Sequence, residues 1–331
     1  MSASPSAPLS SPGSRPIVID CDPGVDDAIA ILLALASPEL DVRGITTVAG
    51  NVGVERTSRN ALQIAELAGR PDIPVFAGCH RPLVVAPIGG QFHGESGLGP
   101  LMLPEPSRQI QPPHAVSFFI EILEDALART RPITLCTLGP MTNIAVLLRV
   151  RPDLIPGIER ILSMGGAYVE AGNRTMTSEF NILADPHAAS IVFSSGIAIT
   201  SLALDATHQA MATPERAAAV QQGLGGPVGA AVKTLLAHWD RNDPRRYGSR
   251  GGPMHDPLVI AALLRPELFE TRKARVFVEH SSALCLGQTV ADWYGKSGET
   301  PNVDIVTRVD ADGFFALLGE RLARYGLREA S

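Results

Sequence analysis

The sequence predicts an α/β fold with a mainly parallel sheet whose two faces are covered by helices. Short runs rich in β-branched residues alternate along the chain with longer stretches of helical character. The chain has 331 residues, of which 45% are hydrophobic, so it can bury one large core or two smaller ones. Neither an internal repeat nor a change in composition marks a domain boundary, and we therefore expect a single domain.

The predicted elements follow one another as βαβ units require. A first strand at Ile17–Ile19 leads into an almost wholly apolar helix at Asp26–Ala36. The other predicted strands are Val42–Val48, Ile133–Thr137, Ile158–Met164 and Ile197–Leu204. The other predicted helices are Glu55–Ala68, Ala115–Arg129, Met141–Val150 and Pro186–Ser194. Residues 212–254 are more helical and end in RNDPRRYGSRGGP, whose lack of periodicity predicts a mobile loop.

Several classes of protein are disfavoured by composition. Residues 1–15 are rich in Ser, Pro and Ala and lack the apolar core of a signal peptide, so we expect a disordered tail before a domain at 16–331. The apolar run Ala28–Ala36 is too short to span a bilayer. A net charge of −6 argues against a surface that binds nucleic acids non-specifically, because such a surface is normally basic. The four cysteines form no CxxC pair, which is typical of reduced thiols in a cytoplasmic protein.

The first strand-to-helix turn carries an unusual concentration of carboxylates. In IVIDCDPGVDDAIAILLALA, Asp20, Asp22, Asp26 and Asp27 fall within eight positions. Ligands bind at the carboxyl ends of strands in open parallel sheets, which is where this turn lies. The N-terminus of one helix cannot offset four negative charges. A hard divalent cation with oxygen ligands, Ca²⁺ or Mg²⁺, could do so.

Simpler explanations for the aspartates fit less well. One aspartate alone would ordinarily be a helix cap beside a solvated loop, but four around a tight turn favour a metal site. An EF-hand counted from Asp20 fails, because Gly24 stands at its fifth position and Ile31 at its twelfth. An aspartyl phosphatase also begins D-x-D, but Gly24 occupies the position where that motif has a small β-branched residue.

DCDPGVDDAIAILLAL closely resembles the signature of the nucleoside hydrolases, the inosine–uridine-preferring N-ribohydrolase family. Seven further segments follow in the family's order: ITTVAGN (45–51), FHGESGLG (92–99), TLGPMTNIA (137–145), MGGAY (164–168), EFNILADPHAA (179–189), LDATHQA (204–210) and MHDP (254–257). Together they cover nearly the whole chain from about residue 16. The resemblance implies one Rossmann-related domain with a mixed, largely parallel sheet, one Ca²⁺ per active site, and a homotetramer or dimer.

The resemblance also implies metal ligands and a reaction. Its ligands are the carboxylates of Asp22, Asp27 and Asp256 and the main-chain carbonyl of Leu138. Asp20 is not a ligand and is expected to orient these neighbours. The reaction is hydrolysis of the N-glycosidic bond of a ribonucleoside through an oxocarbenium-like transition state. Asp22 is the expected general base toward a Ca²⁺-activated water.

Sugar and base contacts follow from the same motifs. The expected substrate-binding residues are Asp26, Asn51, His93, Met164, Asn173, Glu179 and Asn181. The Asn173 match is the loosest, because its segment differs in length from relatives by one residue. His255 matches the general acid that protonates the leaving base. His93 either contacts the ligand or braces its loop, and His208 is expected to be structural. Arg246 and Tyr247 are either a lid over the base or ordinary loop residues.

The sequence thus predicts a Ca²⁺-dependent ribonucleoside hydrolase that releases free base and ribose for nucleobase salvage. Two alternatives remain open. One is hydrolysis of a modified nucleoside with the same apparatus, and the other is a non-catalytic, metal-dependent nucleoside-binding protein. Base preference depends on loops near residues 82–95 and 240–255, and the pair His93 and His255 favours broad or purine-accepting specificity.

Overall fold

The computed structural model describes residues 13–90, 92–238 and 251–328. Within these residues nine strands form one sheet in the order β10-β9-β11-β6-β5-β4-β1-β2-β3. The strands are β1 (Arg15–Cys21), β2 (Leu40–Thr47), β3 (Val75–Ala77), β4 (Ile133–Thr137), β5 (Ile158–Met164), β6 (Ile199–Leu202), β9 (Phe269–Val278), β10 (Thr289–Asp292) and β11 (Val303–Val309). Neighbours from β3 to β11 pair in parallel, whereas β9 is antiparallel to both β11 and β10. The predicted mixed, largely parallel sheet is confirmed.

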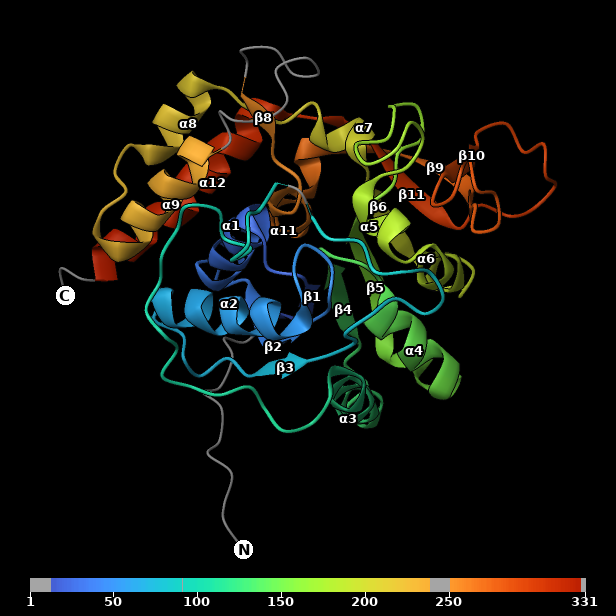
Figure 1. Ribbon diagram of the computed structural model, residues 1–331, viewed down its shortest axis with the longest axis horizontal. Coiled ribbons are helices and arrows are strands. Elements are labelled where there is room, and N and C mark those ends of the chain that lie inside the picture. The colour runs from blue at the N-terminus through green and yellow to red at the C-terminus, as the bar shows by residue number, and fades with distance from the viewer. Residues whose placement is uncertain (1–12, 91, 239–250, 329–331) are drawn as a thin grey trace, which may run out of the picture.

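Helices cover both faces of this sheet (Figure 1). The longer ones are α1 (Val25–Leu35), α2 (Val54–Leu67), α3 (Ala115–Ala128), α4 (Thr142–Val150), α6 (Pro186–Phe193), α8 (Pro214–Gln221), α9 (Gly226–His238), α11 (Pro257–Leu264) and α12 (Ala311–Arg328). Shorter elements are α5 (Phe180–Ala184), α7 (Leu204–Thr207), two 3₁₀ turns at Pro152–Gly157 and Pro266–Leu268, and a two-stranded ribbon of β7 (Met211–Ala212) and β8 (Gly252–Pro253). The five strands and five helices predicted from the sequence are all present, with ends shifted by a few residues.

The two faces of β1 belong to different parts of the core. Ile17, Ile19 and Cys21 pack with α1, α2, α9, α11 and α12, whereas Val18 packs with α3, α4 and α6. This alternation is the ordinary period of a strand that is buried on both sides. Asp20 shares the face of Val18 and therefore points toward α4.

Helix α1 is buried along its whole length, since all eleven of its residues are buried. A helix that is apolar all round belongs in a core, and α1 packs against α2, α11 and the sheet. Its start is fixed by Gly24 in an extended conformation and by Asp27, whose side chain accepts the Gly24 N–H at 2.8 Å. The two carboxylates of its first turn are therefore held in place by the packing of the entire helix.

Some sequence predictions lie outside the described residues. Residues 1–12 of the expected tail and the segment 239–250, with Arg246 and Tyr247, are among them. The first strand begins at Arg15, one residue before the expected start of the domain. Among the helices that are described, none is long and apolar enough to cross a membrane.

Candidate active site

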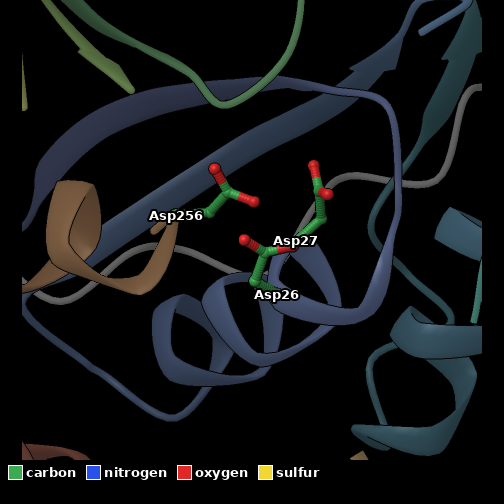
Figure 2. Close-up of side chains that lie close together, drawn as sticks. All are labelled: Asp26, Asp27 and Asp256. Carbon is green, nitrogen blue, oxygen red and sulfur yellow. The ribbon is translucent and has the colours of Figure 1, made fainter. Parts of the chain in front are cut away.

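Three carboxylates from two distant parts of the chain meet at the carboxyl end of the sheet. One oxygen from each of Asp26, Asp27 and Asp256 lies within 4.8 Å of the other two. Asp26 and Asp27 belong to the first turn of α1, and Asp256 is the residue from which α11 starts. Figure 2 shows the three side chains directed toward a common space between these two helices. All three are buried.

Among the residues described, no basic side chain forms an ion pair with any of these three carboxylates. Burial, followed by repulsion from Asp26, raises the pKa of Asp27 to about 7. Burial, together with the charges of Asp26, Asp27 and Asp22, raises the pKa of Asp256 well above its usual value. Oδ1 of Asp256 is buried and has no hydrogen-bond partner in the part of the chain described. Clustered carboxylates with partnerless oxygens are a donor set that fits a hard divalent cation.

Asp22 lies beside the group but is not one of its three members within the residues described. Its Oδ2 accepts the Asn51 N–H at 2.6 Å, while its Oδ1 is buried without a described partner. A β-carbon added to Gly50 or Gly139 would lie only 2.0 or 2.4 Å from these oxygens, so only glycine fits on either side. Burial first, then the Asp27 charge, raises the pKa of Asp22 well above its usual value.

Asp20 lies within β1, two residues before Asp22. Its Oδ1 accepts hydrogen bonds from Thr46 Oγ1 at 2.6 Å and Asn143 Nδ2 at 2.8 Å. Burial raises its pKa to about 7. Asn143 also donates to the Thr47 carbonyl and accepts the Cys79 N–H. Its side chain therefore bonds to residues at the carboxyl ends of β1, β2 and β3. Asn143 was not predicted as a site residue, and the signal for it in the sequence is a single amide side chain within the largely apolar segment 141–150.

The carbonyl of Leu138 follows β4 and faces Asn181. Asn181 Nδ2 donates to the Leu138 carbonyl at 2.7 Å and to the Met164 carbonyl at 3.2 Å. A carbonyl oxygen has two lone pairs, so the Leu138 oxygen retains a second acceptor position. Asn181 and Met164 are both buried at this edge of the sheet.

Glu179 and Asn173 are both found at the start of α5. The buried carboxylate of Glu179 accepts the backbone N–H groups of Asn181, Ile182 and Gly166, and burial raises its pKa to about 7. Asn173 is exposed, and its Oδ1 accepts the Phe180 N–H at 3.0 Å. Glu179 thus lies with the other buried site residues, whereas Asn173 holds the outer side of the same turn.

The histidines differ in their contacts. His93 Nδ1 accepts the N–H of Val25, the first residue of α1, at 3.0 Å, and burial lowers the His93 pKa. This hydrogen bond joins the loop that carries His93 to the start of α1. Nδ1 of the half-buried His255 lies 2.9 Å from Thr207 Oγ1. His208 Nδ1 lies 3.1 Å from Glu170 Oε2.

Comparison with known proteins gives consistent matches over almost the whole chain. The family model described as "Inosine-uridine preferring nucleoside hydrolase" matches residues 17–316. An uncharacterised protein of Schizosaccharomyces pombe is 47% identical over 309 residues, covering 93% of this chain and 99% of that protein. The pyrimidine-specific ribonucleoside hydrolase RihA of Photobacterium profundum is 46% identical over 315 residues, covering 94% and 100%. The solved structure of a purine-preferring ribonucleoside hydrolase from Gardnerella vaginalis superposes with a TM-score of 0.82 at 30% identity, covering 94% and 99%.

Proposed function

The chain belongs to the inosine-uridine preferring nucleoside hydrolase family and hydrolyses the N-glycosidic bond of ribonucleosides, and we propose that its buried aspartates hold Ca²⁺ for that reaction. The observation that carries the proposal is the group of Asp26, Asp27 and Asp256, with oxygens within 4.8 Å of one another. Ca²⁺ suits such a site because it takes several carboxylate and carbonyl oxygens in flexible geometry. Membership of an enzyme family removes the alternative of a non-catalytic nucleoside-binding protein.

The ligand set that we propose is Asp22, Asp27, Asp256 and the Leu138 carbonyl. Asp20 orients these ligands and does not itself bind the metal. Asp26 lies in the closest group of carboxylates, and we assign it to a ribose hydroxyl at the same centre. When bound, Ca²⁺ would lower the pKa of a water molecule and orient the ribose hydroxyls. The partnerless Oδ1 atoms of Asp22 and Asp256 support this assignment.

The chain's own groups supply the proton transfers. Asp22, whose Oδ2 is fixed by the Asn51 N–H, is the proposed general base that takes a proton from the attacking water. His255 is the proposed general acid that protonates the leaving base. The proposed substrate contacts also include Asn51, His93, Met164, Asn173, Glu179 and Asn181. Such contacts fix the ribose in the geometry needed for attack.

We propose that pyrimidine ribonucleosides are the preferred substrates. The pyrimidine-specific relative is 46% identical to this chain, whereas the purine-preferring enzyme is 30% identical. The expectation of broad or purine-accepting specificity depended partly on His93, whose Nδ1 accepts the Val25 N–H. A cytoplasmic homo-oligomer, a dimer or tetramer, would release free base and ribose for nucleobase salvage.

Release of reducing sugar from uridine, cytidine, inosine and adenosine tests the proposal. We expect faster release from uridine and cytidine than from inosine and adenosine. Removal of metal with a chelator should abolish release, and added Ca²⁺ should restore it. Unchanged activity after complete metal removal would contradict the metal assignment, and faster release from inosine would contradict the base preference.

A further inference from the structure

The short helix α7 places a hydroxyl against His255 from a distant part of the chain. Thr207, the last residue of α7, is fully buried, and its Oγ1 lies 2.9 Å from His255 Nδ1 across 48 positions of sequence. The Thr207 N–H is itself bonded to the Ala203 carbonyl at 3.0 Å. The backbone that carries this hydroxyl is therefore fixed.

Helix α7 is also tied to the loop that follows β5. The Asp205 carboxylate accepts the N–H groups of Tyr168 and Val169 at 2.8 Å and of Glu170 at 3.1 Å. The Leu204 N–H donates to the Gly166 carbonyl at 2.9 Å. These bonds join α7 to the strand end that carries Met164, so the Thr207 hydroxyl has a defined place relative to the substrate-binding edge of the sheet.

We infer that Thr207 is a positioning residue for His255, and that its hydroxyl orients the imidazole for protonation of the leaving base. This inference rests on the proposed role of His255 as general acid. A bond to Nδ1 fixes the rotation of the ring and therefore the position of Nε2. A hydroxyl can donate to a ring nitrogen or accept from it, so the contact is kept in both protonation states of the histidine. Misplacement of a reacting group by about 1 Å can cost about 10²-fold in rate.

A purely structural role for the hydroxyl makes a different prediction. If Thr207 only fills space, its substitution should affect every substrate alike. If it orients the acid, the effect should depend on whether the leaving group needs a proton. A nucleobase leaves poorly as an anion, whereas p-nitrophenolate leaves readily without protonation. Uridine and p-nitrophenyl β-D-ribofuranoside therefore separate the two roles.

The test compares substitutions that differ in one group. Thr207→Val keeps the shape of the side chain and removes the hydroxyl, whereas Thr207→Ser keeps the hydroxyl. Thr207→Ala is a second variant without the hydroxyl, in case valine is not accommodated. Thr134→Val is the matched control, because Thr134 is also fully buried and its hydroxyl bonds to Glu159 at 2.6 Å, near the opposite end of β4.

With the Ca²⁺-loaded protein, we expect Thr207→Val to lower kcat for uridine by about 10- to 100-fold and to change KM by less than about threefold. Its turnover of the aryl riboside should stay within about threefold of the parent. Thr207→Ser and Thr134→Val should stay within about threefold on both substrates. This selective loss, with rescue by serine, supports a positioning role.

Two results would overturn the inference. One is uridine turnover within about threefold of the parent in both variants without the hydroxyl, and the other is an equal loss on both substrates. His255→Ala separates these results from a failure of the proposed function. If His255→Ala loses uridine turnover while Thr207→Val keeps it, only the positioning role is wrong. If His255→Ala keeps uridine turnover, the acid assignment itself is wrong.

Discussion

Asp22 combines a fixed orientation with a buried oxygen that has no partner in the described chain. Its Oδ2 is held at 2.6 Å from the Asn51 N–H, and its Oδ1 is the partnerless atom. Asparagine keeps the shape and one acceptor oxygen but cannot take a proton from water. We therefore expect Asp22→Asn to lower kcat for uridine by about 10²- to 10⁴-fold. Steady-state ribose release at saturating Ca²⁺ measures the loss.

The matched control is Asp125→Asn on the surface of α3, where the carboxylate pairs with Arg129. An exposed ion pair contributes little, so turnover should change by less than about twofold. Because Asp22→Asn removes a buried ionisable group, the metal-free variant should unfold at a temperature no lower than that of the parent protein. Turnover of Asp22→Asn within about tenfold of the parent would assign the general base to another residue.

At this scale the sequence predicts which residue types gather but not every contact. The spacing of the aspartates predicts a shared site, but which carboxylates lie closest to Asp256 depends on the rotation of α1. That rotation is set by packing, and it places Asp26 in the closest group. The roles of Asn143 and Thr207 depend on partners 123 and 48 positions away, a separation that local patterns do not report.

At the scale of elements, α1 joins the core to the site. Its first turn carries Asp26 and Asp27, while Leu33 is fully buried further along. Removing a buried leucine side chain loses its burial and leaves a cavity. We expect Leu33→Ala to lower the free energy of unfolding by about 2–5 kcal/mol, as measured by urea denaturation.

Leu127→Ala is the control for the leucine substitution. Leu127 lies in another helix, α3, and is 38% exposed, so its truncation should cost less than about 1 kcal/mol. Equal losses in the two variants would show that α1 is not the buried element described above.

Two of the strands that were not predicted from the sequence have weak local signals. Strand β9 reads FETRKARVFV, and exposed, charged positions interrupt its apolar residues, so no β-branched run marks it. Strand β3 has only three residues, too few for a periodic signal. The strands buried on both faces, such as β1 and β4, are continuous apolar runs and were predicted.

For the molecule as a whole, the site concentrates negative charge where water is excluded. Carboxylates that are far apart in the sequence, between residues 20 and 256, lie together at the carboxyl ends of the strands. Burial raises the pKa of Asp20, Asp27 and Glu179 to about 7. In the folded protein these carboxyl groups keep their protons up to a higher pH. In the unfolded chain they lose their protons near the ordinary carboxyl pKa. The stability of the metal-free protein is therefore linked to pH through the active site.

The sign of this linkage is opposite to that of ordinary surface carboxylates. A group whose pKa is raised by folding stabilises the fold below its unfolded pKa, and that stability is lost as pH rises through the folded pKa. Carboxyls whose pKa is lowered, such as Asp72 beside Arg70, are ionised in both states above about pH 5 and contribute no slope there. We therefore expect the unfolding temperature of the metal-free protein to fall between about pH 5 and pH 8.

Bound Ca²⁺ should remove this fall, because a cation stabilises the ionised carboxylates and protons compete with it at low pH. Differential scanning calorimetry with chelator and with excess Ca²⁺ measures both slopes.

Asp256→Asn should flatten the metal-free slope, because it removes one buried titrating group. Asp292→Asn should leave the slope unchanged, because backbone N–H groups lower the pKa of the half-buried Asp292. A metal-free protein that gained stability across this range would show that the buried carboxylates do not hold protons, and the case for a cation as their partner would lose its electrostatic basis.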